Sequence, residues 1–219
     1  MSFQTSIPAQ REAAAYTREF ADSFPVLLRL GGHSKGGNLA VYAGAKAGPE
    51  RQRRILAVYN LDGPGFTEAM LEDPGYLALV PRIRTYIPES SVIGLLLERE
   101  EAHTVIASRW VGPLQHEPYS WELMAGDFVR VENLSAGSRF VDRTVKNWIR
   151  DMSREDREAL VEGLYRLLRA GGASRVEELL HPKSFRAFLK TLSQEPELKQ
   201  RLKSELPQLL RAAKAAADE

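Results

Sequence analysis

The pattern of apolar and polar residues predicts helices and strands in turn along the first half of the chain. Apolar residues at helical spacing among charges predict an amphipathic helix over Ala9 to Phe24, which Pro25 ends. The sequence PVLLRLGGHS is then an apolar run of strand length, and GGNLAVYAGAKAG has the small residues and spacing of a helix. This stretch predicts a strand, a tight turn and a helix.

Three further strands are predicted downstream. They lie at Ile55 to Leu61, in the sequence RIRTYIP, and at Thr104 to Ser108, while Phe66 to Val80 offers a short helix or lid. The polar loop GPLQHEPYSWEL follows the last strand. Strands that alternate with helices are typical of βαβ units, so we predict an α/β fold with a mostly parallel sheet.

The pattern changes to continuous helical periodicity after about Ser138. Further helices are predicted over residues 173–180, 182–192 and 196–217. We therefore predict two parts, an α/β core over residues 1–137 and a helical C-terminal region over residues 138–219.

Charge and cysteine content narrow the classes of function. The 30 basic and 29 acidic side chains give a net charge of +1, so no nucleic-acid partner is predicted. The absence of cysteine excludes disulfides and thiolate metal sites. No apolar run approaches the roughly 20 residues of a membrane span, and the N-terminus lacks a signal-peptide pattern. A cytoplasmic protein without a transmembrane segment is expected.

The sharpest local signal is the G-x-S-x-G motif of Gly32-His33-Ser34-Lys35-Gly36, at the predicted junction of strand and helix. It predicts a nucleophile elbow, in which Ser34 takes a strained conformation and its hydroxyl stands at the helix N-terminus. Side chains two residues to either side would collide in such a turn. Gly32 and Gly36 are therefore expected to be required there.

A serine nucleophile needs a base, and His116 is the best candidate because it lies in a polar loop just past a strand. His33 lies inside the motif and is expected to point away from the serine. His103 precedes its strand, at the wrong end of the sheet, and His181 lies in the helical region.

The base in turn needs a carboxylate that fixes its tautomer, and two candidates stay open. Asp62 follows the strand Ile55 to Leu61 directly, at the edge where active-site groups of parallel sheets collect, and Gly63-Pro64-Gly65 would hold it rigidly. Glu89 follows the next strand and is the alternative acid.

The backbone N–H of Lys35, the residue after the nucleophile, is the expected first donor of an oxyanion hole. The second donor normally comes from a loop after an early strand, but only one predicted helix and one predicted strand precede the motif. We therefore expect a truncated fold whose N-terminal strands are missing. An uncovered sheet edge would then invite pairing with another chain, such as a second copy.

Four segments carry a resemblance to known families: GHSKGGNLAVYA, VYNLDGPGF, RTYIPESSVIGLLL and QHEPYSWEL. They resemble the class 3 lipase branch of the α/β-hydrolases, and they are more similar still to a bacterial family of lipase-like proteins known as a domain of unknown function. The resemblance implies a partial α/β-hydrolase fold, with Ser34 as nucleophile and His116 as base. In class 3 lipases the acid usually follows the later strand, which favours the Glu89 region.

Other chemistry finds little support in the sequence. GGHSKGG lacks the Gly-Lys-Ser/Thr ending of a phosphate-binding loop, and no second histidine follows His116-Glu117 at helical spacing. No metal or other cofactor is predicted. The aromatic residues around His116 would either line an acyl pocket or simply pack; they are Trp110, Tyr119 and Trp121.

Two functions therefore stay open. One is a serine hydrolase of the esterase, lipase or thioesterase kind, acting on a small-molecule or lipid substrate. The other is a non-catalytic remnant of the hydrolase fold that serves as an interaction or dimerisation module through its sheet edge.

Overall fold

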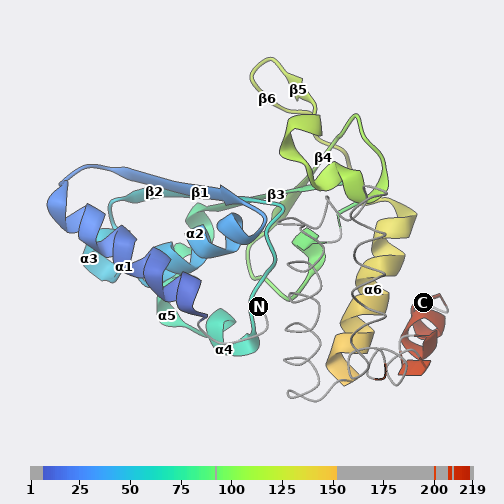
Figure 1. Cartoon of the computed structure of the whole chain (residues 1–219). Coiled ribbons are helices and arrows are strands. Elements are labelled where there is room, and N and C mark those ends of the chain that lie inside the picture. Colours follow the sequence, from blue (N-terminus) through green and yellow to red (C-terminus); the bar gives the residue numbers. More distant parts are fainter. Residues whose placement is uncertain (1–6, 92, 152–199, 201–206, 209, 218–219) are drawn as a thin grey trace. The chain divides into compact units, whose positions relative to one another are not determined.

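The computed structural model describes residues 7–91, 93–151, 200, 207–208 and 210–217. The chain divides into two compact units, one over residues 2–138 and one that begins at residue 139 (Figure 1). Helix α6 (Ala136–Asp151) and the helical residues 207–208 and 210–217 confirm a helical C-terminal region. The helices predicted over 173–180 and 182–192, and most of that over 196–217, lie outside the described residues. The boundary between 137 and 138 stays a prediction.

Four parallel strands form the sheet of the first unit in the order β1-β2-β3-β4, which confirms the predicted α/β fold. The strands are β1 (Leu28–His33), β2 (Ile55–Leu61), β3 (Ile83–Pro88) and β4 (His103–Ile106). Because each strand pairs with the next one along the chain, the carboxyl ends of all four strands meet at one edge. The register aligns His33 with Leu61, and Leu61 with Tyr86.

Strand β4 differs from its predicted range of Thr104 to Ser108. It ends at Ile106 because the next residues bond to the segment that follows the His116 loop instead of to β3. Ala107 donates from its backbone N–H to Val129, and Ser108 forms a bridge with Trp121.

Helices pack on the sheet through small and apolar residues. The helices are α1 (Pro8–Ser23), α2 (Lys35–Ala45), α3 (Pro49–Gln52), α4 (Glu68–Leu71) and α5 (Pro74–Leu79). Helix α2 packs against β1 and β2, and α1 and α5 pack against α2 (Figure 1). The fully buried side chains of this core include Val41, Ile55, Val58, Tyr76 and Leu79. The described helices include none that is long and apolar enough to cross a membrane.

Short 3₁₀ helices fill the connections of the sheet, including the loop after β4. They are η1 (Val80–Arg82), η2 (Ile93–Leu95), η3 (Gly112–His116) and η4 (Pro118–Ser120). An antiparallel hairpin of β5 (Leu123–Met124) and β6 (Asp127–Phe128) follows them. Its turn residues Ala125 and Gly126 both have positive φ, at 53° and 85°, as a type I′ turn requires. Alanine is an unusual residue at such a position, so the sequence carries little sign of this hairpin.

Candidate active site

Ser34 connects β1 directly to α2 and has a strained backbone. Its φ is 55° and its ψ is −126°, a conformation that residues with a side chain rarely adopt and that costs about 1–3 kcal/mol. The surrounding hydrogen bonds hold it there. Its N–H donates to Leu61 at 2.8 Å, and its carbonyl accepts from the N–H of Gly37 at 3.0 Å. The strand-turn-helix geometry expected of a nucleophile elbow is therefore present at Ser34.

The glycines of this turn differ from expectation at one position. A Cβ at Gly32 would collide with the backbone of Gly36, so Gly32 is required as predicted. A Cβ at Gly36 would meet no atom within 4 Å, so the predicted collision at Gly36 is wrong: a side chain at this position would point into open space. The second crowded position is Gly37, where a Cβ would collide with the side chain of Asn60 and lie 2.9 Å from the carbonyl oxygen of Gly32.

Asp62 follows β2 and is fully buried, with a positive φ of 50°. Its N–H donates to Tyr86 at 2.8 Å, which continues the pairing of β2 with β3. Its carboxylate is held on both oxygens: Oδ1 accepts from the Ser91 hydroxyl at 2.5 Å and from the Gly94 N–H at 3.1 Å. The other oxygen, Oδ2, lies 2.7 Å from Nδ1 of His116.

The hydrogen bond to Asp62 decides the tautomer of His116. An ionised carboxylate can only accept, so Nδ1 of His116 carries the hydrogen. In a neutral imidazole the lone pair then lies on Nε2, the nitrogen that a general base uses in this arrangement. His116 ends η3 and is buried.

Ser34 and His116 lie at the same end of the sheet. The ring of His33, the residue before Ser34, packs on the ring of His116 with centroids 4.5 Å apart. Ser34 and Asp62 follow the paired residues His33 and Leu61 of neighbouring strands. The turn of Asp62 also contacts the elbow, because a Cβ on Gly63 would lie 2.6 Å from the carbonyl oxygen of Ser34.

The two remaining sequence candidates lie close by in different roles. The carboxylate of Glu89 is 3.4 Å from the side-chain nitrogen of Gln115, whereas the carboxylate bonded to the imidazole of His116 is that of Asp62. Lys35 is the first residue of α2, so its backbone N–H stands at the positive end of the helix dipole. That position suits a donor to a developing oxyanion.

A partly buried cation, Arg99, lies beside the turn of Asp62. Nη2 of Arg99 donates to the carbonyl of Gly63 at 3.5 Å. Its Nη1 is buried, and within the described part of the chain it has no hydrogen-bond partner. Burial lowers the pKa of Arg99 from its ordinary value, while the negative charges of Glu101 and Asp62 act in the opposite direction. The guanidinium therefore adds positive charge next to the turn that carries Asp62.

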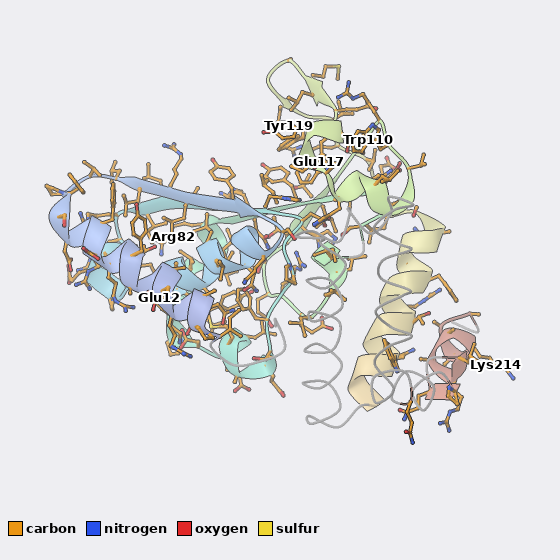
Figure 2. All side chains as sticks on the ribbon, viewed as in Figure 1. Glu12, Arg82, Trp110, Glu117, Tyr119 and Lys214 are labelled. Carbon is orange, nitrogen blue, oxygen red and sulfur yellow. The ribbon has the colours of Figure 1, made fainter. Side chains whose placement is uncertain are left out.

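The aromatic residues near His116 separate into two groups. Trp121 is buried and packs edge-on against Phe128 at 5.5 Å, and Phe128 in turn lies 5.1 Å from Tyr86. Tyr119 and Trp110 are exposed, at 87% and 48%, and Figure 2 draws them with Glu117 on the loop after β4. Trp121 is therefore a packing residue of this loop, and the exposed pair lies on its surface.

Two contributors to the site were not found from the sequence. Ser91 binds Asp62 from the connection between β3 and β4, and the polar Ser90-Ser91 pair after the strand RIRTYIP is its one local sign. His33 has no predicted role beyond pointing away from Ser34, and its Nε2 is 2.7 Å from the carbonyl oxygen of His116. Within the described residues, no group of three or more His, Asp or Glu side chains could hold a metal ion.

The chain matches the Mbeg1-like family, a lipase-like family, over residues 1–166, and this range includes every residue of the site. No curated protein and no solved structure matches the chain significantly. Because the family match covers most of the chain, this protein belongs to the Mbeg1-like family.

Proposed function

We propose that this protein is a serine hydrolase of the carboxylic-ester class, acting on an ester or thioester of a small molecule or lipid. The observation that carries the proposal is the 2.7 Å hydrogen bond between buried Asp62 and Nδ1 of His116. It orients the imidazole as a general base at the strand end that presents Ser34. The lipase-like family supports the same class of reaction.

The proposed reaction proceeds in two halves. The hydroxyl oxygen of Ser34 attacks the substrate carbonyl while Nε2 of His116 takes the hydroxyl proton, and Asp62 stabilises the imidazolium. The oxyanion of the tetrahedral intermediate accepts a hydrogen bond from the backbone N–H of Lys35. Collapse breaks the bond to the leaving alcohol or thiol, which receives the proton from His116. Water, deprotonated by His116, then hydrolyses the acyl-serine and releases the acid.

A fluorophosphonate probe tests this proposal, because it phosphonylates an activated serine. We expect the folded wild-type protein to be labelled and Ser34→Ala to be unlabelled, with Ser90→Ala labelled like wild type. Ser90 is a suitable control because it lies in the same unit and its hydroxyl bonds to Ser135 at 3.3 Å. A folded wild-type protein that resists the probe, or labelling that survives Ser34→Ala, would overturn the proposal.

One observation favours the second candidate, an interaction or dimerisation module. In the described part of the chain β1 pairs on one side only, and exposed apolar side chains precede it. These include Phe24, Val26 and Leu27, with exposed fractions of 51%, 48% and 65%. Exposed apolar residues beside a sheet edge are typical of a pairing surface. For this non-catalytic candidate, light scattering should detect a dimer that Leu27→Lys dissociates, and the folded wild-type protein should resist the fluorophosphonate probe. A monomer at all concentrations would exclude self-association.

A further inference from the structure

His33 connects the strand that presents Ser34 to the loop that carries His116. It is the last residue of β1 and lies directly before Ser34. Its Nε2 is 2.7 Å from the carbonyl oxygen of His116, and its ring packs on the His116 ring at 4.5 Å with a 41° tilt. The indole of Trp121 lies edge-on to the His33 ring, with the two ring centroids 6.4 Å apart.

The chemistry of this contact fixes the donor. A carbonyl oxygen can only accept, so Nε2 of His33 carries the hydrogen in either charge state of the ring. His33 therefore uses this nitrogen to hold backbone and not to take a proton from substrate. A phenylalanine could preserve the ring packing but not the hydrogen bond.

The main chain of the His116 loop is held by hydrogen bonds to its carbonyl groups. The bond from Nδ1 of His116 to Asp62 orients the ring, but it leaves the main chain of η3 to be held by other groups. Two ring N–H groups bind consecutive carbonyls there: the indole N–H of Trp121 donates to Gln115 at 2.7 Å, and His33 donates to His116. Of these two donors, His33 is the one that belongs to the strand leading into the elbow.

We propose that His33 is a positioning residue, which sets the distance between the Ser34 hydroxyl and the His116 imidazole by binding the His116 carbonyl. This inference rests on the proposed serine-hydrolase function. A displacement of about 1 Å between reacting groups can reduce a rate about 100-fold. Loss of the bond should therefore lower kcat while leaving KM unchanged, because His33 binds the enzyme's own main chain.

Two matched substitutions isolate the hydrogen bond. The side-chain N–H of glutamine reaches about as far as Nε2 of histidine, whereas that of asparagine reaches only as far as Nδ1. We expect His33→Asn and His33→Phe to lower kcat for a fluorogenic ester about 10-fold to 100-fold, and His33→Gln to recover most of it. The rate of fluorophosphonate labelling should follow the same order.

The outcomes separate this inference from the proposed function. A wild-type protein that neither hydrolyses esters nor reacts with the probe overturns both. An active wild type with equally active His33→Asn and His33→Phe overturns the positioning role alone. Equal losses of kcat in His33→Asn and His33→Gln, at equal thermal stability, also overturn it, because the reach of the donor would then be irrelevant.

Discussion

The hydroxyl of Ser91 donates a 2.5 Å hydrogen bond to Oδ1 of Asp62, the carboxylate that binds His116 through its other oxygen. The connection between β3 and β4 thus holds the acid from the side opposite to the imidazole. Ser91→Ala should reduce the free energy of unfolding by about 1.5–3 kcal/mol, since the bond is buried and its acceptor is charged. It should also lower kcat/KM about tenfold through looser orientation of His116. Urea unfolding and ester hydrolysis check the two effects.

Ser90→Ala is the matched control for this change. Its hydroxyl contacts Ser135 and not Asp62, so we expect both quantities to stay near those of wild type. Equal effects of the two substitutions would show that the Ser91 bond does not hold the acid.

Substitution of Asp62 or of Glu89 tests which of the two carboxylates is the acid that orients His116. Asp62→Asn replaces an acceptor by a side chain that can donate to Nδ1 of His116, which moves the imidazole hydrogen to Nε2 and removes the base. We expect kcat to fall by about 10⁴-fold, the loss that this substitution causes in a Ser-His-Asp triad. Glu89→Gln retains the contact with Gln115 and should change kcat by less than about threefold. A larger loss in Glu89→Gln than in Asp62→Asn would reverse the assignment.

Much of the fold could be predicted because its signals are local. Apolar runs that end near glycine or proline predict β1, β2 and β3, and helical spacing predicts α1 to within one residue at each end. The hairpin β5–β6 was missed because its turn carries Ala125 at a positive φ, where the usual signal is glycine, asparagine or aspartate.

The site shows the limit of sequence reasoning more sharply. Ser34 and Asp62 are marked by glycine-rich turns at strand ends, which are local features. The choice between Asp62 and Glu89 depends on which carboxylate contacts the imidazole of His116. Asp62 and His116 are more than 50 residues apart in the sequence, and residue spacing does not predict such a tertiary contact. The same holds for His33, whose partner lies 83 residues downstream.

Gly32 and Gly36 should respond differently to alanine, although both belong to the G-x-S-x-G motif. Gly32→Ala forces a Cβ into the backbone of Gly36, so we expect severe destabilisation and loss of probe labelling. Gly36→Ala places a Cβ in open space on α2 and should stabilise the fold by up to about 1 kcal/mol through helix propensity. Thermal unfolding of the two variants measures the difference. Equal destabilisation by both would mean that the turn is packed differently.

Asp73 provides a prediction that is independent of catalysis. It caps α5 by accepting from the N–H groups of Gly75 and Tyr76 at 3.0 and 3.2 Å, and it pairs with Lys46, the residue that follows α2. Burial raises the pKa of Asp73, but the hydrogen bond from Lys46 and those from the two backbone N–H groups outweigh it. The pKa therefore lies below its ordinary value of 3.8.

A lowered pKa in the folded state means that the ionised form of Asp73 stabilises the fold. This contribution is complete above the pKa of the unfolded chain and disappears as pH falls through the folded value, in a window below about pH 4. Asp73→Asn keeps a good cap but loses the charge, so its deficit in unfolding free energy relative to wild type should be full at neutral pH and shrink as pH falls through that window. The free energy of unfolding of Asp73→Ala should be about 1 kcal/mol lower than that of Asp73→Asn at every pH, because alanine also removes the helix cap. Urea unfolding between neutral pH and acid measures both differences, and a deficit of Asp73→Asn that does not change with pH would show that the charge contributes nothing.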